Sequence, residues 1–307
     1  MVKNKLTTIS CFLFFSAGFA PSVLADNLSR YTIDYKLCKD NQGPRCERLR
    51  LGDKYISTTR AKKGYLYACK AGRPSAPGST TSQITWIDWN NQSWNFLKKP
   101  WLPAGEFKTA KGTYTERVSG NKRIIKVNNL PVDRKIGNWP MTKYSTLTRI
   151  DRNPGVPSRR NFTFSLLKNP KKSSRPTCLP EGAIGVTLNG VVLFSDVDAR
   201  GEDAVAHEIV DQYGGHPART EYHYHFVPEH LEKAPLASGH SKKIGWIADG
   251  FPIYGYYGIG GKEMTNAKLD LCHGHTHGNY GYHYHATLEY PYTIGCFRGT
   301  PKLPTRY

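Results

Sequence analysis

The tetrapeptide Tyr-His-Tyr-His occurs twice in this chain of 307 residues, at positions 222–225 and 282–285. A Gly-His step precedes each copy, at 215–216 and at 274–275, and all eleven histidines lie after residue 206. Alternate side chains of an extended strand face the same side, so each copy directs its two histidines one way and its two tyrosines the other. The repeat therefore predicts two equivalent strands, lying side by side, with their histidines on a common face.

This arrangement favours metal binding. Two histidines at i and i+2 on a strand stand roughly 6–7 Å apart at the backbone, close enough for both imidazoles to reach one ion. Neutral imidazoles packed together without partners would cost about 1–3 kcal/mol for each unpaired nitrogen, and a metal ion removes that cost. The alternative is a packing core of imidazole and aromatic rings. We expect a metal site formed by His216, His223, His225, His275, His283 and His285.

Other polar residues near the repeats are candidate additions to the site. Asp249 ends an apolar run and has two possible roles. It is either a metal ligand or the carboxylate that accepts a hydrogen bond from a ligating imidazole, or it is the first residue of an Asx-turn before Gly250. His273 and His277 either extend the site or line it. Three histidines have no motif around them and are interpreted as surface residues: His207, His230 and His240.

The ligand type narrows the choice of metal without fixing it. Sets rich in imidazole and free of thiolate suit zinc, copper(II), nickel and iron, and in an exported protein we expect copper or zinc. A metal-dependent hydrolase or oxidase is the alternative to a binding protein, because three histidines around an open position also activate water. Asp249 or Glu208 would then act as the base, and no other catalytic residue is indicated. The absence of a G-x-S-x-G motif disfavours hydrolysis without a metal.

The N-terminus has the pattern of a secretory signal peptide. Lys3 and Lys5 precede an apolar stretch over residues 6–19, and Ala25 provides a small residue for cleavage. The stretch is too short to span a membrane, and no later segment approaches the ~20 apolar residues that a transmembrane helix needs. The sequence predicts a secreted or periplasmic protein.

Six cysteines remain after cleavage removes Cys11. In an exported protein this number indicates three disulfides, with fifteen connectivities open. Cys272 and Cys296 bracket the second Tyr-His copy and are expected to pair. The other four cysteines would then form two disulfides. Cys38 with Cys46 would close a short loop, and Cys69 with Cys178 would be a long-range bond.

The mature chain is strongly basic. Without Lys3 and Lys5, 41 basic residues face 24 acidic ones, for a formal net charge of +17. Such a charge favours anionic partners such as envelope polymers or lipid headgroups, and no nucleic-acid-binding module is recognisable. A third hypothesis follows, in which residues 26–116 form a wall-binding or adhesion module and the histidines are structural. The oligomeric state is not specified.

The texture of the chain is that of a mainly β protein. Short apolar runs separated by Gly, Pro and Asn predict strands near 54–59, 65–69, 83–89, 123–127, 161–167, 183–188, 191–195, 244–248 and 253–257. The clearest helical window covers residues 202–213. We expect an antiparallel sandwich-like or barrel-like fold, stapled by disulfides, with one or two short helices. The expected domains are 26–116, whose tryptophans at 86, 89, 94 and 101 favour packing over a sugar platform, and 117–307.

Several ordered motifs resemble the YHYH domain family, named for this tetrapeptide. They are Gly185-Val186-Thr187-Leu188-Asn189-Gly190, Asp249-Gly250-Phe251-Pro252-Ile253-Tyr254-Gly255, and the segments around both tetrapeptides. The likeness covers roughly residues 120–300 and implies the fold of that family more than a chemistry. The chain departs from the family pattern at Tyr213 and near His230, where cysteines are common, and at Asp133, where a histidine is expected. The first departure implies a missing disulfide.

Overall fold

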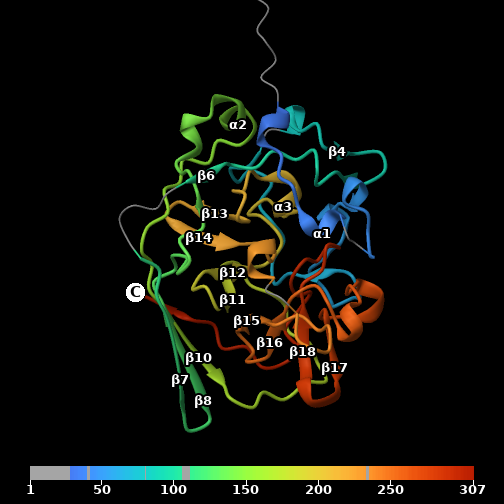
Figure 1. Cartoon of the computed structure of the whole chain (residues 1–307), viewed down its shortest axis with the longest axis vertical. Helices are drawn as coiled ribbons and strands as arrows, with labels where there is room; N and C mark the ends of the chain where they lie inside the picture. The colour runs from blue at the N-terminus through green and yellow to red at the C-terminus, as the bar shows by residue number, and fades with distance from the viewer. Residues whose placement is uncertain (1–27, 40–41, 80, 106–110, 233–234) are drawn as a thin grey trace, which may run out of the picture.

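A computed structural model describes residues 28–39, 42–79, 81–105, 111–232 and 235–307. The proposed signal peptide, with Cys11 and Ala25, lies outside the described residues. The fold is mainly β, as expected, and its α-helices are short: α1 (Lys36–Lys39), α2 (Ser145–Ile150) and α3 (Ala204–His207) (Figure 1). No helix in the described part of the chain is long and apolar enough to cross a membrane.

The centre of the molecule is an eight-stranded sheet. Neighbouring strands run antiparallel, except that β12 is parallel to β14 and β16 is parallel to β18. The sheet is therefore mostly antiparallel, as expected, and contains two parallel pairs. In spatial order its strands are β13 (Gly215–Ala218), β14 (Glu221–Tyr224), β12 (Val192–Phe194), β11 (Ala183–Thr187), β15 (Lys243–Ile247), β16 (Pro252–Tyr254), β18 (Gly281–His285) and β17 (Gly274–His277).

This sheet is an internal duplication. Each half consists of two hairpins joined through a parallel pair, and the halves meet where β11 and β15 pair antiparallel. Gly185 and Gly245, 60 residues apart, occupy equivalent positions beside a register shift in each half. A Cβ atom on Gly245 would lie 2.3 Å from the carbonyl oxygen of Val186, so the glycine permits the close approach of the two central strands.

The two Tyr-His strands, β14 and β18, do not lie side by side. Four strands separate them in the sheet, a distance of about 24 Å at ~4.8 Å per strand. The prediction of adjacent strands is wrong because the halves are joined through β11 and β15, which places each Tyr-His strand next to an outer edge. The prediction of a common face holds within the sheet: His223 is in register with Val192 and His285 with Tyr254.

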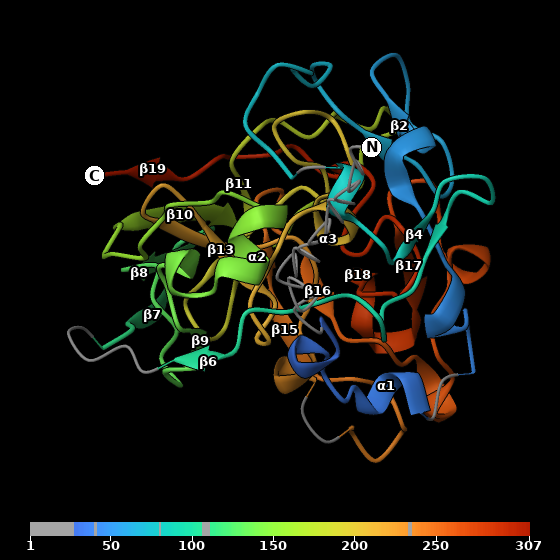
Figure 2. The same ribbon diagram turned by 90° about the horizontal axis from the view of Figure 1, so that it is seen from above.

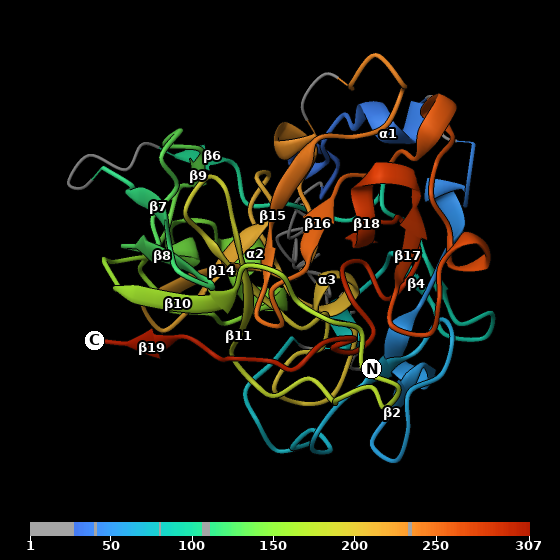
Figure 3. The same cartoon turned by 90° about the horizontal axis from the view of Figure 1, so that it is seen from below.

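A second sheet covers part of the central one. Its strands, in order, are β19 (Thr305–Arg306), β10 (Phe162–Leu167), β8 (Lys122–Val127) and β7 (Tyr114–Ser119), all antiparallel. Alternate residues of β10 are buried, and this apolar side packs against Val186, Val192 and Trp246 of the central sheet. The two layers make the fold sandwich-like. Figures 2 and 3 show this small sheet on the opposite side of the molecule from β17, β18 and α1.

The N-terminal segment contributes to a larger core on the tyrosine side of the central sheet. Trp86, Trp94 and Trp101 are buried there together with Tyr222 and Tyr284, so their role is packing. Trp89 stays 40% exposed. The described residues of this segment up to residue 105 form short strands, which are β1 (Leu49–Arg50), β2 (Ile56–Ser57), β3 (Leu66–Tyr67), β4 (Ile87–Asp88), β5 (Ser93–Trp94) and β6 (Ala104–Gly105), the last paired with β9 (Ile136–Gly137).

The helix expected over residues 202–213 is much shorter. Asp203 caps α3 by accepting a hydrogen bond from the Ala206 amide, but the helix ends at His207 and Glu208 is extended. The next residues are not helical: the Ile209 amide donates to the Asp151 carboxylate, and the Ile209 side chain is buried in the core. Tertiary contacts therefore override the helical pattern.

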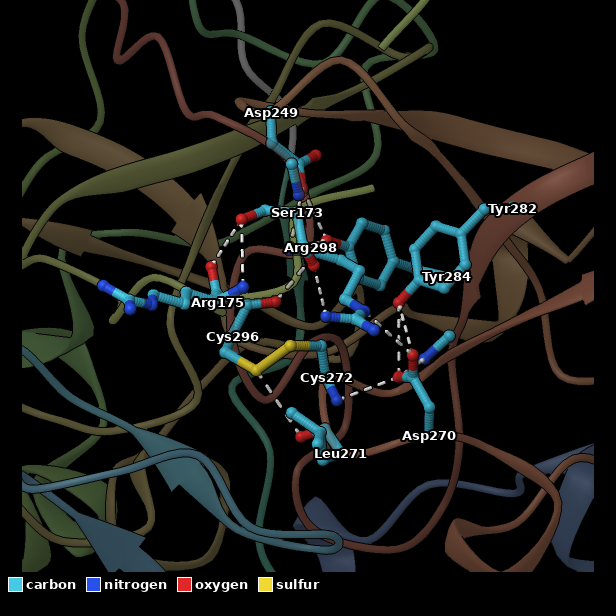
Figure 4. The surroundings of a disulfide bond; sticks show 12 residues. Ser173, Arg175, Asp249, Asp270, Leu271, Cys272, Tyr282, Tyr284, Cys296 and Arg298 are labelled. Carbon is cyan, nitrogen blue, oxygen red and sulfur yellow. Dashed lines mark hydrogen bonds and ion pairs between the residues drawn. A yellow bond between two sulfur atoms is a disulfide. The ribbon is translucent and has the colours of Figure 1, made fainter. Parts of the chain in front are cut away.

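The three expected disulfides are all present. They join Cys38 to Cys46, Cys69 to Cys178 and Cys272 to Cys296, with Cα–Cα distances of 5.6, 4.9 and 4.5 Å. The long-range bond ties the N-terminal segment to the chain just before β11. Cys272–Cys296 lies among the polar residues around Asp270 and Arg298 (Figure 4). Three disulfides are typical of an oxidising, extracytoplasmic compartment.

Candidate metal centres

The first histidine centre comprises His216, His223 and His225. His216 on β13 lies directly opposite His223 on β14, and His225 follows that strand. Their Nε2 atoms converge, at 2.9 Å between His216 and His223, 2.9 Å between His223 and His225, and 3.1 Å between His225 and His216. All three side chains are buried. The compact group results from one hairpin register and the alternation of a single strand.

The backbone fixes the proton on two of these rings. The Nδ1 of His223 lies 2.9 Å from the carbonyl oxygen of Glu221. The Nδ1 of His225 is hydrogen-bonded to the carbonyl oxygen of Ser195. A carbonyl oxygen only accepts, so each Nδ1 carries the hydrogen and each Nε2 presents a lone pair. Two lone pairs thus face each other in a buried site. A cation placed between them would turn this repulsion into ligation.

The geometry of the three nitrogens suits a transition metal. With separations near 3 Å, all three Nε2 atoms could bind one ion at the usual bond length of about 2.0–2.1 Å. Burial lowers the pKa of His225 to about 4 and holds the pKa of His216 and His223 well below the usual imidazole range. The rings are therefore neutral at pH 7, as ligation requires.

The second histidine centre comprises His240, His275, His283 and His285, whose donor atoms all lie within 4.8 Å of one another. The Nε2 of His283 is 3.0 Å from that of His275 and 3.4 Å from that of His240. Burial again lowers the pKa of His283 to about 4. Three rings have Nδ1 hydrogen-bonded to backbone carbonyls, which are Ser241 for His240, Gly281 for His283 and Gly255 for His285.

The two centres have equivalent arrangements, including these hydrogen bonds. The carbonyls that orient His283 and His285, at 281 and 255, lie 60 residues after those that orient His223 and His225, at 221 and 195. A family model described as "YHYH protein" matches residues 163–267, which include the first centre and His240. The chain contains a YHYH domain. The match is narrower than the expected 120–300 and ends before the second tetrapeptide. No curated protein and no solved structure matched the chain.

The chain thus holds two candidate centres, the first inside the matched YHYH domain and the second largely beyond it, whereas the sequence predicted one. The histidines expected to act together are divided between opposite parts of the sheet, three in each half. His240 was expected at the surface and is instead buried in the second centre. Its position, just before β15, is not part of a repeated motif. The 60-residue shift places Pro180 at the equivalent position in the first half, so the repeat gave no signal for this histidine.

The other two histidines interpreted as surface residues are also engaged. His207 is 1% exposed, and its Nε2 lies 3.0 Å from the Asp53 carboxylate. His230 is partly buried, with its Nε2 3.6 Å from Asp133. Neither lies in a histidine centre. Both predictions of surface positions were wrong for the same reason. The N-terminal segment and nearby loops cover positions that carry no apolar periodicity, so the sequence pattern does not indicate that they are buried.

His273 and His277, the candidate additions, stand outside the second centre. His273 is buried with both ring nitrogens in hydrogen bonds, Nδ1 with the Thr293 carbonyl at 2.8 Å and Nε2 with the Thr287 hydroxyl at 3.2 Å. His277 is exposed, and its ring lies 6.1 Å from that of His275. His273 therefore has the contacts of a structural residue, and His277 lies beside the site.

The tyrosine hydroxyls of the repeats bind polar side chains on the face of the sheet opposite the histidines. The Asp249 carboxylate accepts from the Tyr284 hydroxyl at 2.6 Å and from the amides of Phe251, Arg298 and Gly299 (Figure 4). Its bond with the Phe251 amide is an Asx-turn. Asp249 thus lies with the tyrosines, and neither histidine group includes it.

Sequence reasoning missed a further repeated carboxylate. The Tyr222 hydroxyl donates to Asp211 at 2.7 Å, and the Tyr282 hydroxyl is 3.2 Å from Asp270. Each aspartate stands five residues before the histidine of its Gly-His step, a spacing that could have revealed it. These bonds anchor the Tyr-His strands from behind.

A cavity of about 730 Å³ opens beside the first centre. Its walls include all three histidines, Phe194 and Glu208. The Phe194 ring stacks on His223, with ring centres 3.9 Å apart. The Glu208 carboxylate lies 3.3 Å from the Nε2 of His216 but is not part of the compact group of donors. The first centre is thus built at the wall of a cavity with an acidic side chain at its margin.

Proposed function

We propose that this is an exported protein that binds transition-metal ions, with one ion in each histidine centre. The observation that carries the proposal is the convergence of imidazole lone pairs whose Nδ1 hydrogens are committed to backbone carbonyls. This arrangement occurs twice, and burial keeps the rings neutral. A packing core of imidazoles would instead alternate donors with acceptors.

Copper and zinc are the metals that we propose. Both centres offer imidazole nitrogens without thiolate, since all six cysteines of the described chain are in disulfides. The basic surface is compatible with attachment to anionic envelope polymers or headgroups, which would hold such a protein near the cell. A wall-binding module with purely structural histidines does not account for the facing lone pairs.

Metal counting tests the proposal. Protein exported by its own signal, purified without chelators and then loaded with copper or zinc, should carry two ions per chain by elemental analysis. His223→Ala and His283→Ala should each remove one ion, and the double variant should carry none. His277→Ala is the matched control, because this exposed histidine lies beside the second centre, and it should retain both ions. A loaded parent without stoichiometric metal, or a folded double variant that retains it, would overturn the proposal.

A further inference from the structure

The two centres differ at their fourth position. In the second centre His240 provides a fourth imidazole, and the Tyr280 ring stacks on it with ring centres 4.4 Å apart. The 60-residue shift places Pro180 and Thr220 at these positions in the first half. Neither has an imidazole or an aromatic ring, and Pro180 lines the cavity. The second centre thus has a fourth imidazole, whereas the first centre has none at the equivalent position.

Resting on the proposed function, we infer that the first centre holds its metal with an exchangeable coordination position that faces the cavity. This position takes water or a small anionic ligand, whereas the second centre is closed by four imidazoles. Three neutral histidines leave the charge of a divalent ion uncompensated, so an anion or an oxygen donor is the ligand class that fits. The cavity of about 730 Å³ provides the path for exchange.

Glu208 is a positioning residue for the ligand in this open position. Its carboxylate is 3.3 Å from the Nε2 of His216, yet it does not belong to the group whose donors lie within 4.8 Å of one another. Two ligands of one ion with bonds near 2.1 Å can be at most ~4.2 Å apart, so in this arrangement the carboxylate stands beside the coordination sphere. There the carboxyl group can hydrogen-bond to a water in the open position.

No counterpart of Glu208 exists in the second half. The Asp-x-x-x-Gly-His segments begin at Asp211 and Asp270, and the residue three places before each is Glu208 in one copy and Ala267 in the other. The backbone of Glu208 is held by buried Lys99, whose Nζ donates to its carbonyl at 2.8 Å. The Glu208 carboxyl group is therefore a feature of the first centre that the repeat does not share.

Azide binding to the cobalt(II)-loaded protein tests the inference, because azide is a small anion that changes the visible spectrum of an open cobalt site. The His283→Ala variant, which keeps the first centre, should respond to azide, and the His223→Ala variant should not. His240→Ala should retain two ions and gain a second azide response. If cobalt, copper and zinc all fail to load at the two centres, the proposed function itself fails. If both load and the first centre does not respond, only the present inference fails.

The role of Glu208 has its own readout. In the His283→Ala background, Glu208→Ala should retain its cobalt and bind azide about tenfold more tightly, because the hydrogen bond that holds the competing water is removed. Glu181→Ala, a change of a second carboxylate that lines the cavity, should leave both the cobalt content and the azide affinity unchanged. Equal azide affinity with and without the Glu208 side chain would remove the assigned role.

Discussion

Replacing Asp249 with alanine should destabilise the fold without removing metal. The Oδ2 atom of Asp249 accepts from the Tyr284 hydroxyl at 2.6 Å, the Gly299 amide at 2.9 Å and the Arg298 amide at 3.1 Å. Tyr284 and Gly299 are buried, so truncation leaves two buried donors without this acceptor. At about 1–3 kcal/mol for each such group, we expect a loss of about 3 kcal/mol in the free energy of unfolding.

Urea denaturation of the metal-loaded protein measures this loss. Tyr284→Phe removes one of the donors, so its effect and that of Asp249→Ala should be less than additive in a double-mutant cycle. Asp34→Ala, at an exposed carboxylate paired with Lys39, should change stability by less than about 0.5 kcal/mol. The reasoning would be refuted if Asp249→Ala kept its stability but lost the ion of the second centre, because the carboxylate would then be a ligand.

Three further predictions concern pH and the disulfide. Metal should dissociate from both centres as the pH falls below about 4, because protons compete there for imidazoles such as His225 and His283, whose pKa burial lowers to about 4, and dialysis over a pH series followed by metal analysis measures this. Burial raises the pKa of Asp196 to about 8, above its unfolded value, so its stabilising contribution is complete below about pH 4 and is lost as the pH rises toward 8. Asp196→Asn should therefore lose less stability than the parent between pH 4 and 8, and a parallel loss in both would contradict the assignment. Replacing Cys272 and Cys296 together by alanine should lower the free energy of unfolding by roughly 3 kcal/mol, whereas unchanged thermal unfolding would show that the bond constrains little.

The local pattern of the chain predicts its strands well. Alternation in residues 161–167 corresponds to β10, and the two tetrapeptides form β14 and β18 with histidines and tyrosines on opposite faces. These features depend on side-chain periodicity, which is a property of neighbouring residues. The disulfide of Cys272 with Cys296 was predictable for the same reason, since the pair brackets one short motif.

The number of centres was not predictable in this way. It depends on the pairing of β11 with β15, a non-local contact that separates the two Tyr-His strands. His240 joins the second centre from a loop whose counterpart is Pro180, so neither periodicity nor repetition indicates it. The helix predicted over 202–213 ends at His207, because Ile209 and Val210 are buried in the core and the Ile209 amide binds Asp151, tertiary contacts that local sequence does not encode.

The antiparallel contact between β11 and β15 gives this single chain the layout of a two-fold symmetric dimer whose subunits have been joined. In a dimer of identical subunits every substitution appears in both sites at once. A joined pair has no such constraint, since codon 180 and codon 240 can change separately while the shared sheet keeps both halves in place. Pro180 in one half and His240 in the other show that equivalent positions of this duplicated scaffold can carry different residues, and therefore different sites.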